Sequence, residues 1–504
     1  MNQNAVVVPV LRLRRDTAGW SYKIPSNAVC LPGSLVIVPF RNRPTLGVVW
    51  ELRQDDLAQE QISQVLTSAP LVLALQRQLI EYLAEAGLIS LSTALYVWLP
   101  RWLRSLPLTK GVQQRLREST DGSNQAQQAI LLPGRRPVQE QLLASRNPAL
   151  LFSDVTEAQL QQNWWNISTT KQSLGIGREG ALFAPWHNLQ QLLIVEPEDI
   201  SYYHEQTPYL PLVAVACELA RINRITPQWR STLPTVVAQT VWGEGARGND
   251  LLPESITHLD LQHQPLLSDT VVERIQTTIQ QGQSIVILHN AHDRLSKPNS
   301  SGLRKAVLGV QGITRTLQQR LGVSELPNSI IIGTRAILQR PYTNVGLTVA
   351  LNLDQLLDTF LFPEQLHGWS DLGHLFRYSG HCVIQSHQPE HPLIQALLQK
   401  KWSDYLIERV LARQTAHLPP FCQQLVVSIK ENTPAADELY LKLQPLVAEP
   451  WQLSYPFQGL WRKKEYSHLM LTAPLGERLP ATLRKALVAV PSPWKVQRSP
   501  WHIM

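Results

Sequence analysis

The sequence predicts an α/β protein with a small β-rich module at its start and a small α+β domain at its end. Three observations support this prediction. Short apolar segments bounded by Pro, Gly or Asn fill the first 53 residues, as strands joined by turns do. Apolar runs of strand length then alternate with helical patterns between residues 130 and 400, which is typical of parallel α/β sheets. A content of 44% hydrophobic and 17% charged residues is compatible with sizeable cores.

Changes of pattern along the 504 residues divide the chain. The helical segment shows apolar residues at helical spacing, and the linker is polar and rich in turn residues. The predicted segments are the β-rich module 1–66, the helical segment 67–106, the linker 107–129, two α/β units at 130–246 and 247–400, and the α+β domain 401–504. Near the last boundary, residues 391–414 have the pattern of one long helix.

Four cysteines lie far apart and no CxxC pair is present, so no structural zinc site is predicted. They are Cys30, Cys217, Cys382 and Cys422. No basic start followed by a long apolar core marks a signal peptide, and no uncharged apolar run reaches the roughly 18 residues that a membrane span needs. We therefore expect a soluble, cytoplasmic protein.

The first 53 residues carry much of the positive charge: seven Lys or Arg against two acids, a net of +5, compared with +7 for the whole chain. A basic patch suggests a polyanion partner, most often nucleic acid, and ordinary surface charge is the alternative. Small β-barrel-like modules commonly bind oligonucleotides on an exposed sheet face. The predicted DNA contacts are Arg12, Arg14, Trp20, Tyr22, Arg41 and Arg43.

Two pairs among these residues are predicted to share a strand face, because side chains repeat every second residue. Arg12 and Arg14 form one pair on the first strand, and Trp20 and Tyr22 form the other on the second. Aromatic rings beside arginines can stack a base and hold its phosphate. The alternative for Trp20 is packing in the core of the module.

Acidic residues follow directly after a buried strand in the first α/β unit. The apolar run from Leu189 to Val195 is followed by Glu196, Glu198 and Asp199. Nucleotide-binding sheets deliver acids to a magnesium site from the end of such a strand. The run therefore predicts the acidic-box strand of an NTP-driven motor, although a proline interrupts the acids.

Several phrases, in this order, resemble the PriA family of primosomal replication-restart helicases. They are WSYKIP, LPGSLVIVPFRNR and LGVVWEL, then AEAGLISLSTALYVWLP, GREGALFAPWHNLQQLLIVEPEDISYYHE, SIIIGTRAI, VIQSHQPEHPLIQALL and SPWHIM. The resemblance implies a DNA-binding module, a winged-helix-like segment, two RecA-like helicase lobes and a C-terminal domain. It covers nearly the whole chain.

The departures from that family concern the motor. An active member needs the phosphate loop GxxxxGK[ST], whose lysine neutralises phosphates and whose hydroxyl holds magnesium. The matching position reads LLPGRRPVQEQLL, without the Lys-Ser/Thr pair and with Pro137 removing an amide donor. The acidic box is altered at its first positions, and only Arg377 remains of the second-lobe arginines.

Two further departures point the same way. Gln339-Arg340 stands in place of a Lys-Gly pair, and residues 290–309 contain no cysteine where full members insert a zinc module. We therefore expect a motor that does not hydrolyse ATP, with no cofactor and no metal. Its degenerate nucleotide site would comprise Gly134, Arg135, Arg136, Glu196, Glu198 and Asp199.

The DNA-binding module departs from the family too. The family's pocket for a 3′ DNA end resembles a Phe-Asp pair and a Gly, and this chain has Trp20-Ser21 and Arg41 at those positions. Trp20 keeps an aromatic platform and Arg41 adds charge. Ser21 lacks the carboxylate that bonds a terminal sugar hydroxyl, so DNA contact is predicted and 3′-end specificity is not.

Three other patterns are discounted or left open. Gly175, Gly177 and Gly180 spell GxGxxG, but a dinucleotide fingerprint needs a preceding strand, a following helix and a downstream acid. His289, His292 and Asp293 lack a fourth metal ligand. The pair Trp164-Trp165 fits either a core or a partner surface.

The sequence thus predicts a DNA-binding, PriA-like protein without ATP hydrolysis, which recognises forked or primed DNA and helps to assemble replication-restart proteins. A weak ATP-dependent helicase that uses Arg135, Arg136, Glu198 and Asp199 is the first alternative. A protein scaffold without DNA contact is the second, and the basic first module argues against it.

Overall fold

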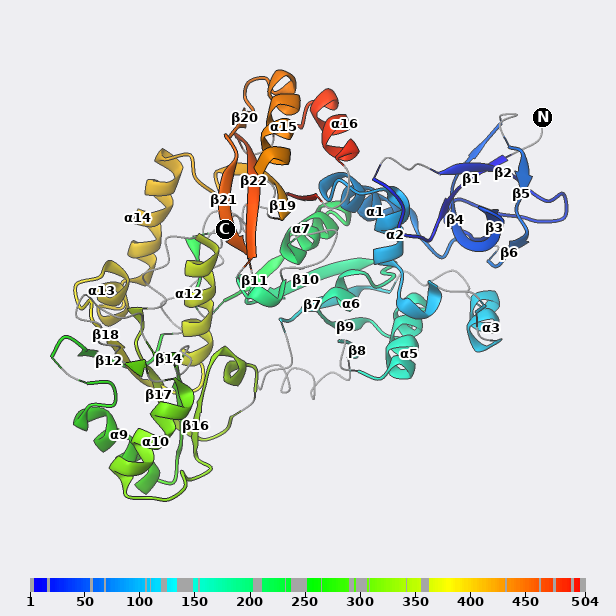
Figure 1. Cartoon of the computed structure of the whole chain (residues 1–504). Helices are drawn as coiled ribbons and strands as arrows, with labels where there is room; N and C mark the ends of the chain where they lie inside the picture. Colours follow the sequence, from blue (N-terminus) through cyan, green and yellow to red (C-terminus); the bar gives the residue numbers. More distant parts are fainter. Residues whose placement is uncertain are drawn as a thin grey trace.

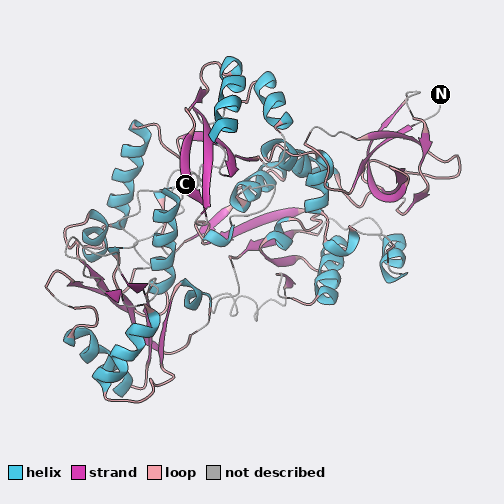
Figure 2. Ribbon diagram, in the orientation of Figure 1, coloured by secondary structure: helices cyan, strands magenta, loops and turns pink. Residues whose placement is uncertain are grey.

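A computed structural model of the chain describes residues 4–15, 19–54, 58–67, 69–104, 107–108, 110–118, 125–133, 148–152, 155–202, 211–231, 233–236, 252–263, 265–289, 294–295, 306–307, 309–340, 342–354, 362–430, 433–461, 464–474, 477–490 and 494–498. Within these ranges it is a mixed α/β protein with two parallel sheets, two mainly antiparallel sheets and a separate pair of short strands (Figures 1 and 2). Among the helices described, none combines the length and apolar composition that crossing a bilayer requires.

The first sheet has six strands in the order β5-β2-β1-β4-β3-β6, and all pairings are antiparallel except β2 with β5. The alternating segments predicted strands here, and the structure forms them. β-Branched residues, which favour strands, are frequent in the central ones. The strands are β1 Asn4–Pro9, β2 Trp20–Lys23, β3 Leu35–Phe40, β4 Arg43–Arg53, β5 Glu60–Gln61 and β6 Gln64–Val65.

Two helices follow, α1 Ala74–Ala86 and α2 Leu91–Trp98, and then the short 3₁₀ helix η1 Arg101–Leu103. α2 begins at an N-cap serine, Ser90, whose hydroxyl accepts the Thr93 N–H at 3.2 Å. Leucines of α1 and α2 share one buried cluster with valines of the first sheet and with side chains of the following α/β unit. The sheet and the helices, predicted as separate segments, are therefore joined by a common core.

The first α/β unit has a parallel sheet in the order β11-β10-β7-β9-β8. Its strands are β7 Gln127–Leu131, β8 Ala149–Leu151, β9 Leu174–Gly177, β10 Leu189–Val195 and β11 Gln228–Arg230. Its helices are α5 Glu157–Ser168, α6 Glu179–Leu182, η2 Ile200–Tyr202 and α7 Leu212–Ile222. The predicted linker contains a helix, α3 Lys110–Glu118, and the first residues of β7.

The second α/β unit has a parallel sheet in the order β12-β18-β17-β13-β16, with helices on both faces. Alternate residues of β13 belong to different buried clusters, Val286 on the side of α12 and Ile285 on the side of α9 and α10. The strands are β12 Ser255–Asp260, β13 Ser284–Leu288, β16 Ile330–Gly333, β17 Val345–Ala350 and β18 His381–Ser386, with a separate pair β14 Arg294–Leu295 and β15 Ala306–Val307. The helices are α9 Asp269–Gln280, α10 Val310–Leu321, η5 Arg335–Gln339 and α12 Phe362–Phe376.

The single helix predicted over 391–414 is wrong, because the chain forms two helices there, α13 Pro392–Leu398 and α14 Trp402–Thr415. Lys400 between them has a positive φ of 54°, a left-handed conformation that ends the first helix. Trp402 begins the second helix and is fully buried in the core beneath it. Burial of this ring therefore fixes the bend between α13 and α14.

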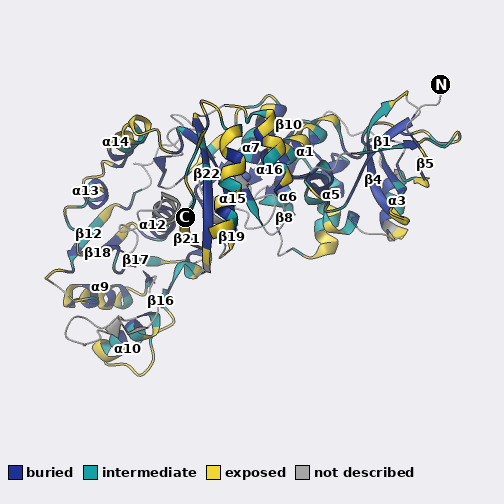
Figure 3. Cartoon of the chain, turned by 45° about the horizontal axis from the view of Figure 1, so that its top comes forward, coloured by how far each residue is buried: buried dark blue, intermediate teal, exposed yellow. Residues whose placement is uncertain are grey.

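The last domain pairs an antiparallel sheet with two helices, as the α+β pattern predicted. Figure 3 shows its helices carrying exposed outer faces beside the buried strand β22. Its elements are β19 Cys422–Lys430, α15 Thr433–Leu443, η6 Gln444–Leu446, β20 Gln452–Leu453, β21 Phe457–Trp461, β22 Lys464–Pro474, α16 Ala481–Ala489 and β23 Lys495–Arg498.

Candidate functional site

A hairpin end gathers three of the predicted DNA-contact residues. The turn between β3 and β4 consists of Arg41 and Asn42, both with positive φ (50° and 60°), the conformation of a tight two-residue hairpin. Arg41 and Arg43 are exposed, and the Arg41 guanidinium lies 5.3 Å from the centre of the Phe40 ring. Trp20 contacts the same ring edge-on at 4.7 Å. An aromatic pair flanked by two cations can stack a base and attract its phosphate.

Tyr22 does not join this group, which corrects its predicted role in DNA contact. Its side chain is 3% exposed and packs with the core of the module. The Tyr22 hydroxyl donates to the Pro39 carbonyl at 3.0 Å, and burial raises the pKa of Tyr22 to about 12. The face that Trp20 and Tyr22 share points inward, and Trp20 remains half-buried because it sits at the end of the strand.

Arg12 and Arg14 also differ from the prediction, since β1 ends at Pro9 and neither arginine lies on a strand. They flank Leu13, whose backbone bonds to the start of α2: its N–H donates to the Thr93 hydroxyl at 3.1 Å. Both arginines are exposed, and Arg12 lies over the ring of Tyr96 at 5.3 Å. By its contacts, Arg12 belongs to the helical segment rather than to the hairpin end.

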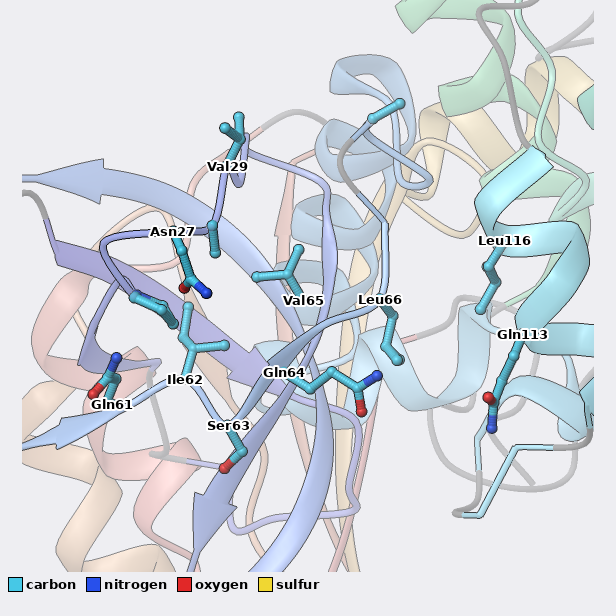
Figure 4. Close-up of a pocket in the computed structure, with 13 residues that line it drawn as sticks. Asn27, Val29, Gln61, Ile62, Ser63, Gln64, Val65, Leu66, Gln113 and Leu116 are labelled. Atoms are coloured by element: carbon cyan, nitrogen blue, oxygen red, sulfur yellow. The ribbon is translucent and has the colours of Figure 1, made fainter.

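A pocket beside this module holds none of the six predicted DNA-contact residues (Figure 4). It has a volume of about 870 Å³ between the β5–β6 segment and α3. Amide groups and apolar side chains line it, among them Asn27, Gln64 and Gln113. None of its lining residues is charged, so it adds no electrostatic attraction for DNA.

The three acids after β10 are all buried, at 3% exposure or less. The residue that follows the strand, Glu196, has a positive φ of 50°, which is uncommon outside glycine and asparagine. Its carboxylate forms an ion pair with Arg377, a residue just beyond α12 in the second α/β unit. The first acid is therefore held by a cation of the other unit.

The third acid, Asp199, is held from the same helix. Its Oδ2 lies 2.7 Å from Nε2 of His374, and both side chains are at most 3% exposed. The Ser370 hydroxyl, one turn earlier on α12, lies 3.2 Å from the same ring nitrogen. On the same helix, both carboxylate oxygens of Asp371 accept a hydrogen bond from Nε of Arg335, each at 2.8 Å. Burial of Asp371 raises the pKa of its carboxyl group. One face of α12 thus forms a buried polar junction with the acidic strand end.

Glu198 differs from its neighbours because it contacts a hydroxyl rather than an arginine or a histidine. The Ser231 hydroxyl donates to its Oε1, and burial raises the pKa of Glu198 to about 8. A carboxyl that keeps its proton at neutral pH is a poor ligand for magnesium, which prefers ionised oxygen ligands. Among the residues described, no group of three or more His, Cys, Asp or Glu forms a metal site.

The positions predicted for the phosphate loop, Gly134, Arg135 and Arg136, lie outside the described residues, as do His292 and Asp293. β7, which precedes the loop, runs parallel to β10 with Leu131 opposite Ile194. The strand that leads to the loop and the strand that leads to the acids therefore end at the same edge of the sheet, as the prediction of one nucleotide site requires.

The GxGxxG pattern has a packing explanation. Gly175 and Gly177 lie in β9, and a Cβ on Gly175 would come within 2.6 Å of the Trp186 ring. A Cβ on Gly177 or Gly180 would come within 2.4 Å of the Leu151 carbonyl oxygen. These glycines allow β8, β9 and α6 to approach closely. Trp164 and Trp165, left open from sequence, are both buried in the core.

Sequence reasoning missed His374, Asp371, Arg335 and Ser231. Aspartate, histidine and arginine stand at 371, 374 and 377, and this helical i, i+3 spacing places them on one face of a helix. That spacing could have identified a polar helix face. It could not have identified the acids that this face contacts, because they lie some 175 residues earlier in the chain.

Comparison with known proteins agrees with the arrangement of the first two segments. Residues 5–100 match the family model of the PriA 3′ DNA-binding domain, which spans the first sheet together with α1 and α2. The chain is PriA-like. Two replication restart proteins PriA are similar to it over longer stretches. The protein of Haemophilus influenzae is 20% identical over 369 residues, covering 55% of this chain and 50% of that protein.

The PriA of Thermotoga maritima is 18% identical over 431 residues, covering 67% of this chain and 58% of that protein. The chain thus spans about half the length of the curated relatives it matches. Among solved structures, a single-residue variant of Saccharomyces cerevisiae Dbp5 bound to RNA and ADP BeF3 is 13% identical, with a TM-score of 0.33 over 63% of this chain and 91% of that one. Dbp5 itself, bound to RNA and ADP BeF3, is also 13% identical, with a TM-score of 0.32 over 59% of this chain and 81% of that one.

Proposed function

We propose that the chain is a DNA-binding protein of replication restart that does not hydrolyse ATP. The match of residues 5–100 to the PriA 3′ DNA-binding domain is the observation that carries the DNA-binding part. The exposed hairpin end with Trp20, Arg41 and Arg43 supports it. DNA binding through such cations is electrostatic and therefore salt-dependent.

The absence of hydrolysis is supported by the surroundings of the acids. Phosphoryl transfer requires carboxylates that reach a magnesium ion at the phosphates. Here Glu196 and Asp199 contact Arg377 and His374 instead, and Glu198 keeps its proton at neutral pH. The sequence around Gly134 also lacks the Lys-Ser/Thr pair of a phosphate loop.

In this proposal the two parallel-sheet units serve as a structural platform and do not act as an ATP-driven motor. The protein recognises forked or primed DNA in the cytoplasm and presents it to other restart proteins. Similarity to PriA proteins of two organisms supports this role. The buried contacts between α12 and the acidic strand end support a platform of fixed geometry.

The test compares binding to forked and plain duplex DNA at two salt concentrations, with and without ATP. Trp20→Ala and Arg41→Glu are the variants, and Lys442→Glu, an exposed charge reversal on α15, is the matched control. We expect tighter binding to the fork, weakened in both variants, retained in the control and indifferent to ATP. Binding that requires ATP and releases phosphate would establish the weak helicase instead. If the chain bound neither DNA, the remaining alternative would be a protein scaffold without DNA contact.

A further inference from the structure

A second cavity lies apart from the hairpin end, where the helical segment meets the first parallel sheet. Its volume is about 590 Å³. Five aromatic residues line it among aliphatic side chains: Trp98 of α2, Trp102 of η1, Phe152 just after β8, Trp164 of α5 and Phe183 at the end of α6. Rings among aliphatic side chains can stack on a flat, aromatic ligand group.

Packing holds part of this wall in place. Trp164 meets Trp102 edge-on at 5.4 Å and Trp165 edge-on at 5.1 Å. Trp164 and Trp165 are each 4% exposed, so their rings have little freedom to rotate. The cavity therefore exists before any ligand arrives.

Positive charge lies on the side of the helical segment. Arg12, Arg101 and Arg104 line the cavity, and the guanidinium groups of Arg12 and Arg104 both lie over the Tyr96 ring, at 5.3 and 4.6 Å. Arg104 also donates to the Leu99 and Val97 carbonyls, which fixes its orientation. An anionic group attached to the aromatic ligand would find three cations on this side.

Two acids of the first α/β unit, Glu157 and Glu179, also line the cavity. Glu179 lies 3.5 Å from the adjacent Arg178, which offsets part of its charge. The cations of the lining therefore come from Arg12 and the helical segment, and its acids come from the α/β unit. A ligand with an anion at one end is favoured with that end beside the arginines.

We propose that this cavity binds one unpaired nucleobase of single-stranded DNA, with the adjoining phosphates on Arg12 and Arg101. The proposal rests on the proposed DNA-binding function and adds a second contact point to the hairpin end. Every base has a π face that can stack on aromatic side chains without regard to sequence, and cations track the backbone. The cavity belongs partly to the segment that matches the PriA 3′ DNA-binding domain, since Arg12 and Trp98 fall within residues 5–100.

Photocrosslinking tests the proposal with single-stranded oligonucleotides that carry one 5-iododeoxyuridine at successive positions. We expect crosslinks to peptides containing Trp102, Phe152 or Phe183. An abasic nucleotide at the crosslinking position should weaken binding by at least about fivefold, because no base remains to stack. Crosslinks confined to the hairpin end would overturn the proposal while leaving DNA binding intact.

A pair of charge reversals supplies the second measurement. Arg101→Glu at the cavity should weaken binding of single-stranded DNA and reduce the crosslink yield at Trp102, whereas Lys171→Glu, an exposed reversal away from the cavity, should leave both unchanged. Thermal unfolding of both variants checks that they are folded. Equal binding by the two variants contradicts the proposal. If the wild-type chain binds no DNA at all, the proposed function fails together with the cavity.

Discussion

The hairpin end of the first module and the acidic strand end of the first parallel sheet place charged residues in opposite environments. Arg41 and Arg43 are exposed beside an aromatic pair, so water and a polyanion can both reach them. Glu196, Glu198 and Asp199 are buried, and a side chain from elsewhere in the chain contacts one carboxylate oxygen of each.

This difference is the one expected between the proposed DNA-binding surface and a structural contact inside the protein. An exposed cation contributes little to folding and is available to a ligand. A buried carboxylate must be compensated by the protein, so its removal or that of its partner is felt by the fold. The two regions should therefore respond to substitution in opposite ways.

The largest expected effect is on stability at the acidic strand end. Arg377→Ala removes the cation that compensates the buried Glu196, and breaking such a pair costs about 3–5 kcal/mol in the free energy of unfolding. Denaturant unfolding measures it. Arg221→Ala is the control, since it breaks an ion pair with Glu218 whose arginine is mostly exposed, and should leave the unfolding midpoint nearly unchanged. Equal unfolding midpoints for the two variants would show that the ion pair of Arg377 with Glu196 does not stabilise the fold.

The next effect is on DNA affinity at the hairpin end. Reversing both charges, Arg41→Glu with Arg43→Glu, should weaken binding at low salt without changing the unfolding midpoint. The plot of log affinity against log salt should become shallower by about one for each phosphate that the protein no longer neutralises. A fluorescence-anisotropy salt series measures both quantities. An unchanged salt slope would place the phosphate-binding cations elsewhere in the chain.

A smaller effect concerns pH. Burial raises the pKa of Glu198 to about 8 from an ordinary value of 4.5, so between these values the folded chain holds a proton that the unfolded chain has released. Its stabilising contribution is present below pH 4.5 and is lost as the pH rises through 8. Glu198→Gln, which keeps an acceptor for Ser231, should flatten the fall in unfolding free energy between about pH 5 and pH 8. The nearby Asp371, also raised in pKa by burial, would leave some slope. Identical pH profiles would refute the assignment.

The smallest expected effect distinguishes the two possible roles of Tyr22, packing in the core and contact with DNA. Tyr22→Phe removes the hydroxyl that donates to the Pro39 carbonyl, which costs about 1 kcal/mol of stability. DNA affinity should not change, because the ring is buried. A loss of affinity with unchanged stability would restore the stacking role that the sequence predicted for Tyr22.

Local patterns predicted much of the fold. Short alternating segments identified β1 to β4, and the apolar run from Leu189 to Val195 identified β10, because a buried strand requires apolar residues at neighbouring positions. The sequence also placed the acids at the end of a strand, and β10 does end at Val195. What it missed depended on contacts between distant residues.

Tyr22 and Asp199 illustrate that limit. The face shared by Trp20 and Tyr22 was predicted correctly, but which face the core covers is decided by strands β3 and β4 and by side chains such as Val36. The contact of Asp199 with His374 joins two α/β units, and no periodicity encodes it. Local pattern therefore located the candidate residues, and tertiary packing decided whether they face solvent or the interior.

One measurement tests the central claim, that the acidic strand end is a joint and not a catalytic site. Phosphate release by the wild-type chain is followed with ATP, magnesium and saturating forked DNA, beside its affinity for that DNA with and without ATP. We predict no phosphate release above background and the same affinity for forked DNA with and without ATP. Release of phosphate that Glu198→Gln abolishes, with an affinity that depends on ATP, would contradict this claim.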